Sequence, residues 1–109
     1  MNTERKDPPG ASSAMTILEA IAGESLTFGR LLRATRDGEG ETQEVFARRL
    51  GVSKSHLSDI ENGRKVVSAA RAARWAELLG YSPRQFVQLA LQDELRDAGL
   101  PFRVEVRAA

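Results

Sequence analysis

The chain has 109 residues, of which 41% are hydrophobic and 28% charged, and its formal net charge at pH 7 is +1. This length suits one domain with extensions, and the absence of cysteine excludes a disulfide framework and a thiolate metal site. No apolar run approaches the ~18 residues of a membrane-spanning helix, and no signal-peptide pattern opens the chain, so we expect a cytoplasmic protein with no membrane partner.

The first quarter of the chain predicts a leader and one short helix. Residues 1–13 contain prolines, glycine and small polar residues without an apolar anchor, which is typical of a disordered leader. In residues 14–24, Met15, Leu18 and Ile21 recur at helical spacing. We therefore expect a short leading helix that packs against the domain.

Residues 25–98 predict an all-α domain of five helices. Each expected helix carries apolar residues three or four positions apart and follows a serine or threonine that can cap its first turn. For the last helix, Pro83 and Gln85 also predict a capping box with Ser82. The expected helices are 28–36 after Ser25 or Thr27, 43–50 after Thr42, 54–62 after Ser53, 69–79 after Ser68 and 83–98 after Ser82.

The segment Thr42–Arg64 contains two short helices with a tight connection. Gly51 follows the first helix directly, at a place where a residue without a Cβ enters the left-handed conformation most easily. In the second helix, Leu57 and Ile60 lie three residues apart and face the same side. Two helices of about two turns with so short a connection cross steeply, which is the helix-turn-helix arrangement.

The second helix of this pair has a polar face that two interpretations explain. The face consists of Lys54, Ser55, His56, Ser58 and Asp59. A solvated face is the ordinary property of an amphipathic helix. However, the helix is too short to be stable alone, and its side chains are short donors and acceptors that can reach base edges in a major groove.

The residues that fix this pattern resemble a known family. Phe28–Leu79 resembles the lambda/Cro-type repressor DNA-binding domain of the XRE-like bacterial and phage regulators. The pattern is an arginine, then S/T-Q-x-x-apolar-A-x-x-Leu-G-Val-S, then I-E-x-G. It is carried here by Gly29, Arg36, Gln43, Ala47, Gly51, Val52, Ser53, Ile60, Glu61, Asn62, Gly63, Ala76, Leu79 and Gly80.

The resemblance implies a role for individual residues in binding double-stranded DNA. Lys54 suits the O6 and N7 atoms of guanine, Asp59 suits the N4 amine of cytosine, and Ser55 reads little by itself. These three positions are the expected base-reading sites. The expected phosphate contacts are Gln43, Ser53, His56, Arg64 and Lys65.

The resemblance also implies a structural bridge between Arg36 and Glu61. A bidentate pair of this kind would join the first helix of the domain to the recognition helix, and we interpret it as scaffold. Residues 37–41 (DGEGE) depart from the family pattern, because Glu41 stands where the family usually has an apolar residue. This acidic loop lies close to the expected path of the phosphates.

Trp75 has two interpretations as well. An exposed tryptophan can serve as a stacking platform for a base. At the family spacing, however, Trp75 falls on the inner face of its helix, so a core position is favoured. We also assign Tyr81 to packing.

The C-terminal residues 99–109 predict a short β-strand. Phe102, Val104 and Val106 alternate with charged residues, which is a strand pattern. A lone strand needs a partner for its backbone groups. Pairing with a second copy gives a homodimer, pairing with a different protein is the main alternative, and a frayed tail is the third.

The sequence favours a binding protein over an enzyme. The single histidine, His56, lies on the expected recognition helix, and no metal-ligand cluster, cofactor motif or phosphate-binding glycine loop is present. Since one subunit offers few specific base contacts, we expect a homodimeric repressor on a palindromic operator with half-sites about 34–36 Å apart. The alternative is an antitoxin-like module that binds a partner protein such as a toxin and regulates its own operon.

Overall fold

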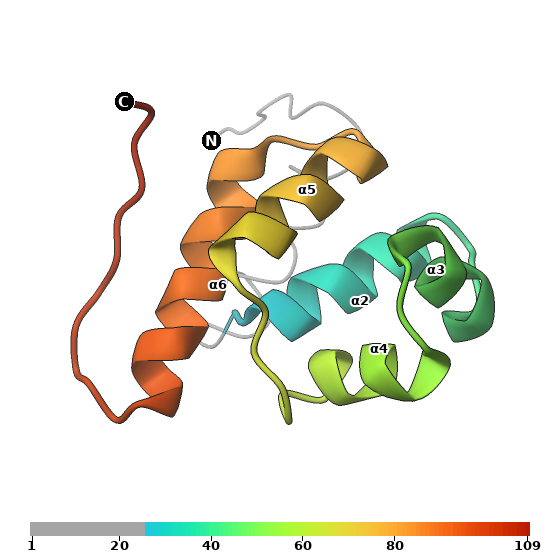
Figure 1. The fold of residues 1–109 in the computed structure, drawn as a ribbon, viewed down its shortest axis with the longest axis horizontal. Coiled ribbons are helices and arrows are strands. Elements are labelled where there is room, and N and C mark those ends of the chain that lie inside the picture. The colour runs from blue at the N-terminus through green and yellow to red at the C-terminus, as the bar shows by residue number, and fades with distance from the viewer. Residues whose placement is uncertain (1–25) are drawn as a thin grey trace, which may run out of the picture.

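The computed structural model describes residues 26–109, so the expected leader (1–13) and leading helix (14–24) lie outside the described residues. The described part of the chain folds as five α-helices, as predicted, and contains no β-strand (Figure 1). The helices are α2 (Phe28–Gly38), α3 (Gln43–Leu50), α4 (Lys54–Glu61), α5 (Ala69–Leu79) and α6 (Pro83–Asp97).

Serine or threonine side chains cap the N-termini of most of these helices. In α2 to α5 the capping oxygen accepts a hydrogen bond from the backbone N–H three residues later, which satisfies a donor with no partner inside the helix. The expected capping box of α6 is wrong, because Ser82 makes no such bond and Pro83 begins the helix. The four capping residues are Thr27, Thr42, Ser53 and Ser68.

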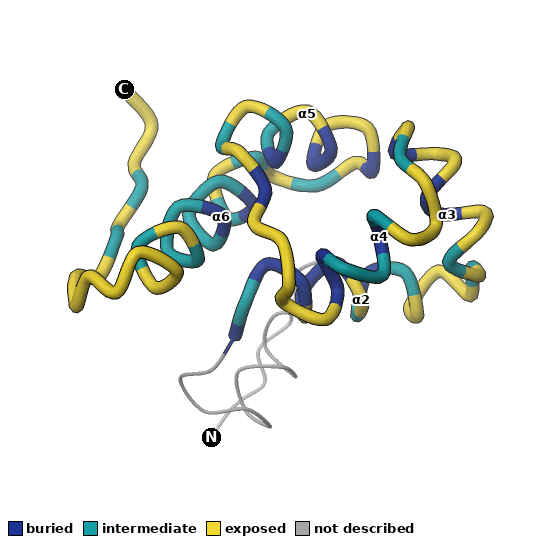
Figure 2. Tube along the Cα trace, turned by 60° about the horizontal axis from the view of Figure 1, so that its bottom comes forward, coloured by how far each residue is buried: buried dark blue, intermediate teal, exposed yellow. Residues whose placement is uncertain are grey.

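The apolar faces of all five helices meet in one core, and Trp75 is part of it. Its side chain is buried, its ring stacks on Phe28 with the centroids 6.4 Å apart, and its indole N–H donates to the Leu50 carbonyl over 3.1 Å. The core interpretation of Trp75 is therefore confirmed, and a base-stacking role is excluded. Figure 2 shows that exposed stretches lie on α3, on the turn after α4 and on the C-terminal tail.

Helices α2 and α4 touch through their backbones at Gly29. A Cβ at this position would lie 2.1 Å from the carbonyl oxygen of Ile60 and 3.0 Å from that of Glu61. Both are backbone atoms, which cannot turn aside as a flexible side chain would. Glycine is therefore required for the last turn of α4 to rest on α2.

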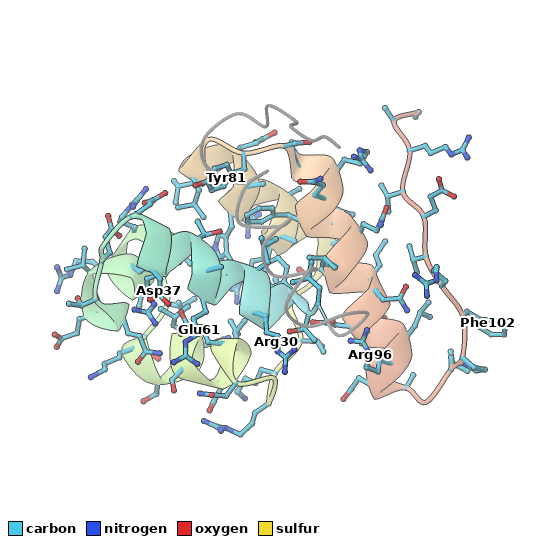
Figure 3. All side chains as sticks on the ribbon, turned by 180° about the vertical axis from the view of Figure 1, so that it is seen from behind. Arg30, Asp37, Glu61, Tyr81, Arg96 and Phe102 are labelled. Atoms are coloured by element: carbon cyan, nitrogen blue, oxygen red, sulfur yellow. The ribbon has the colours of Figure 1, made fainter. Side chains whose placement is uncertain are left out.

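A buried carboxylate joins α2, α3 and α4. Glu61, whose side chain is 1% exposed, accepts hydrogen bonds from Arg36 Nε at 2.8 Å, Arg36 Nη2 at 3.0 Å and Gln43 Nε2 at 2.9 Å. The hydrogen bonds to Glu61 raise the pKa of Arg36. Arg36 Nη1 also donates to the Glu41 carbonyl over 3.0 Å. The side chain of Glu61 thus extends from the end of α4 toward α2 (Figure 3).

Helix α6 is joined to the start of α2 by Asp93. Its carboxylate accepts a hydrogen bond from the backbone N–H of Phe28 over 3.1 Å and another from Arg96 over 3.0 Å. Burial raises the pKa of Asp93. This contact supplies a second acceptor at the N-terminus of α2, beside the Thr27 cap.

The expected C-terminal β-strand is wrong for this structure. Residues 101–109 are extended but pair with no other strand, and they run back along α6 (Figure 1). Gln92 donates to the Phe102 carbonyl and accepts from the Val104 N–H, each over 2.8 Å, while Gln88 accepts from the Val106 N–H over 3.0 Å. The glutamine side chains replace the backbone of a neighbouring strand.

The spacing of the two glutamines fits the extended chain. Four helical residues rise about 6 Å, and two extended residues span about 6.6 Å. Gln88 and Gln92 therefore match backbone groups two residues apart in the tail. The valines turn inward and are half-buried, whereas Arg103 and Glu105 are exposed, which explains the alternation in the sequence.

The Glu61 network gives a first prediction about stability. Replacing Arg36 by alanine leaves a buried carboxylate with one side-chain donor, so the free energy of unfolding should fall by about 3–5 kcal/mol. Arg36→Lys keeps the positive charge but loses the bidentate geometry of the guanidinium. Its free energy of unfolding should therefore lie between those of Arg36→Ala and the wild type. Urea unfolding followed by circular dichroism measures both.

The matched control for this prediction is Arg33→Ala, an exposed arginine on the same helix. It should change the free energy of unfolding by no more than about 0.5 kcal/mol. Equal effects of Arg33→Ala and Arg36→Ala would show that the Glu61 network does not stabilise the fold.

A second prediction concerns the tail. Gln92→Leu keeps the side-chain size but removes both hydrogen bonds to the tail, so exchange of the Val104 amide hydrogen should become about tenfold faster. Global stability should change by less than about 1 kcal/mol, because the helices do not depend on these bonds. Hydrogen exchange followed by NMR tests this, with Gln85→Leu on the same helix as control. Unchanged exchange at Val104 would contradict the assigned role of Gln92.

Candidate nucleic-acid interface

The turn between α3 and α4 sets the direction of the second helix. Gly51 has the left-handed φ of 78°, and the Val52 N–H closes the end of α3 by donating to the Ala47 carbonyl over 3.0 Å. Leu57 and Ile60 then anchor α4 in the core at 0% and 1% exposure. The opposite side of α4 therefore faces solvent.

The first turn of α4 is the most accessible part of this surface. Lys54 and Ser55 are exposed, and neither side chain makes a hydrogen bond or ion pair within residues 26–109. Ser53 is also exposed, but its hydroxyl accepts from the His56 N–H over 3.0 Å and holds the start of the helix. The structure thus presents a lysine and a serine from a fixed helix end.

The third expected base-reading residue, Asp59, has a partner already. Arg64 Nε donates to Asp59 Oδ1 over 3.0 Å, with the two side chains 62% and 31% exposed. The sequence assigned Asp59 to a base and Arg64 to a phosphate, and the structure joins the two. An exposed pair of this kind contributes about 0–1 kcal/mol, so it can separate readily when a better partner arrives.

The remaining expected phosphate contacts lie in different surroundings. Gln43 is half-buried at the start of α3, and its amide nitrogen donates to Glu61, so it braces α4 directly. His56 is half-buried on α4, while Lys65 is exposed in the turn that follows. Gln43 and Lys65 thus differ: the first is held by the scaffold and the second extends into solvent.

The acidic loop before α3 is paired internally, which the sequence did not reveal. Arg49 Nη1 contacts Glu39 Oε1 and Glu41 Oε2, each at 2.6 Å, and its hydrogen bond to Glu39 raises the pKa of Arg49. Tyr81 donates to Glu39 over 3.4 Å, and burial raises the pKa of this tyrosine. Two acids of the loop are therefore compensated by an arginine and do not face incoming phosphates unpaired.

The described residues hold no metal-binding cluster. Among residues 26–109, no group of three or more histidine, aspartate or glutamate side chains could hold a metal ion. None of the helices described is both long and apolar enough to cross a membrane. The exposed side of α4 is accordingly the candidate site.

Comparison with known proteins agrees with this geometry. The family described as a helix-turn-helix domain matches residues 27–89, which contain all of α2 to α5 and the first half of α6. The uncharacterized HTH-type transcriptional regulator YazB of Bacillus subtilis (strain 168) is 44% identical over 59 residues, which cover 54% of this chain and 86% of that protein. No solved structure matches the chain significantly. The chain belongs to the helix-turn-helix domain family, in agreement with its lambda/Cro-type, XRE-like sequence pattern.

Proposed function

We propose that this chain is a sequence-specific DNA-binding transcriptional regulator whose recognition helix is α4. The observation that carries the proposal is the exposed first turn of α4, with Lys54 and Ser55 facing solvent from a helix whose far end is fixed by Glu61. The helix-turn-helix family is not enzymatic, and its relative in Bacillus subtilis is named as a transcriptional regulator. The proposal requires no cofactor.

The start of α4 supplies the attraction to DNA. Helix N-termini offer free N–H groups and a partial positive charge, and both favour phosphate oxygens. Lys54 lies at this end and can reach a guanine in the major groove. Gln43 stands at the corresponding position of α3, and the second N–H of its amide nitrogen, beyond the one given to Glu61, can donate to a phosphate oxygen.

The Asp59–Arg64 pair adds an exchange of partners whose energy depends on the DNA sequence. On DNA, Arg64 transfers from Asp59 to a phosphate, and Asp59 becomes available to accept a hydrogen bond from a cytosine amine. Because the free protein keeps the two charges together, Asp59 does not repel phosphates during the first encounter. Opposite a base without a donor, the released carboxylate remains unpaired and lowers the affinity.

We further propose that two copies bind a palindromic operator and repress transcription by occupying it. One domain presents one lysine and one aspartate to the bases, and a good contact discriminates by only about 1–3 kcal/mol. Two copies double this difference when their half-sites lie a whole number of DNA turns apart, at about 34–36 Å per turn. The antitoxin-like alternative is favoured by a single feature, the 63% exposed Phe102 on the tail.

The function is tested by binding of the purified chain to DNA from its own upstream region and to shuffled DNA, at two salt concentrations. A preference of about 10³-fold for the native sequence would establish an operator-binding regulator. Equal, weak and steeply salt-dependent binding to both would mean that only phosphates are read, and would refute sequence-specific regulation.

Lys54 provides a sharper test of the recognition helix. Lys54→Ala should weaken binding to the operator about tenfold, because a base contact of about 1–3 kcal/mol is lost, and should change binding to shuffled DNA much less. Arg84→Ala, which removes an exposed charge at the start of α6, is the matched control and should lower both affinities equally and slightly. If Lys54→Ala also lowers both affinities equally, Lys54 contacts phosphate and α4 does not read bases through it.

A further inference from the structure

We propose that the C-terminal tail is the dimerisation element of this chain. In this proposal the tails of two copies pair edge to edge as an antiparallel ribbon, in the one register that places Val104 opposite Val104 of the second copy. The inference deepens the proposed function, since it assigns the surface that forms its homodimer, but it rests on the geometry of the tail alone.

The tail has one satisfied edge and one open edge. In an extended chain, alternate residues direct their N–H and C=O groups to opposite edges. The groups of Phe102, Val104 and Val106 face α6, where Gln88 and Gln92 bind them. The backbone groups of Arg103 and Glu105 therefore face away from α6, and no hydrogen bond within residues 26–109 uses them.

This open edge is accessible along its length. In Figure 1 the tail runs beside α6, and no other described element lies on its far side. Phe102 extends from the outer side of the tail (Figure 3) and is 63% exposed. An extended, flat and unpaired edge is a template for another strand. The glutamine contacts hold the template straight before a partner arrives, which lowers the entropy lost on pairing.

Two-fold symmetry and charge select the register. In a register centred on Arg103 or on Glu105, that residue would lie opposite the same residue of the second copy, and identical charges would stand directly opposite each other, which is unfavourable. With Val104 at the centre, Arg103 of each copy lies opposite Glu105 of the other. These residues are the ones with free backbone groups, so each pair exchanges both of its N–H to C=O hydrogen bonds.

The same register matches the apolar residues. Val104 meets Val104 of the second copy, and the backbone of Phe102 falls opposite that of Val106. Pro101, which has no N–H, falls opposite Arg107 and needs only to accept. A register centred on Val106 also pairs opposite charges, Glu105 with Arg107, but it pairs Val104 with the smaller Ala108.

Cysteine cross-linking distinguishes these registers, because the chain has no cysteine of its own. The central residues of the ribbon would lie about 4.5 Å apart between Cα atoms, within the range of a disulfide. Val104→Cys should therefore form a covalent dimer on mild oxidation of the full chain. Val106→Cys is the matched control and should not, since its counterpart would be about 13 Å away.

A charge exchange tests the same register without a covalent bond. Arg103→Glu and Glu105→Arg should each weaken dimerisation about tenfold, because attraction becomes repulsion at two symmetric pairs. The double variant, with Glu at 103 and Arg at 105, should restore it. Sedimentation equilibrium or light scattering of the full chain, without DNA, gives the dimer dissociation constants.

Each result bears on the proposal separately from DNA binding. Cross-linking by Val106→Cys instead of Val104→Cys would overturn the register, and a monomer at all concentrations would overturn the proposal. If the dimer dissociation constant is unchanged by all these substitutions, the interface lies elsewhere and the tail proposal is overturned. Operator binding could still stand in that case. Conversely, Lys54→Ala should dimerise like the wild type, so loss of DNA recognition leaves the tail ribbon intact.

Discussion

The structure depends first on a buried carboxylate that is fully engaged. Glu61 is almost without solvent, and its oxygens are bound by an arginine from α2 and a glutamine from α3. A buried charge is tolerated only when its hydrogen-bonding partners are in place. The bonds of Glu61 to Arg36 and Gln43 therefore fix the relative positions of the three helices more narrowly than apolar packing alone would. The helix-turn-helix is therefore not a self-sufficient unit. It is held by the arginine that precedes it in the chain.

Pairing of charges also explains how a weakly basic chain can approach DNA. The loop before α3 carries acids near the expected path of the phosphates, but Arg49 binds two of their carboxylates. Asp59 is covered by Arg64 in the same way. In both cases the arginine neutralises the carboxylates, so that they repel an approaching phosphate less. Lys54 and Lys65 remain exposed, and we propose that residues such as these set the electrostatic field that a phosphate meets.

Local signals in the sequence were sufficient for the helices, and the family resemblance supplied one long-range contact. Caps, glycines and apolar spacing placed every helix boundary of the described chain within about two residues, and the family pattern placed Arg36 against Glu61. The tail was misread because alternation reports only that one face is buried, and a helix with two suitably spaced glutamines buries it as well as a sheet does. The contact of Asp93 with the start of α2 could not be predicted, since 65 residues separate the partners and they become neighbours only when the helices pack. The pairs of Arg64 with Asp59 and of Arg49 with Glu39 and Glu41 join nearby residues, but sequence spacing alone does not fix the side-chain rotamers that bring them together.

The close approach at Gly29 separates the contacts that hold α4, the proposed recognition helix, from the exposed residues at its start. The backbone contact with α2 and the Glu61 bonds all act on the last turn of α4, whereas Lys54 and Ser55 stand at its first turn. The side chains of Lys54 and Ser55 take no part in these contacts, and the cap at the first turn comes from Ser53. Lys54 and Ser55 can therefore be exchanged without removing the contacts that hold α4 in place. If α4 reads bases as proposed, base preference and fold stability are separable traits in this domain, which allows new DNA specificities to arise, by evolution or by design, on an unchanged scaffold.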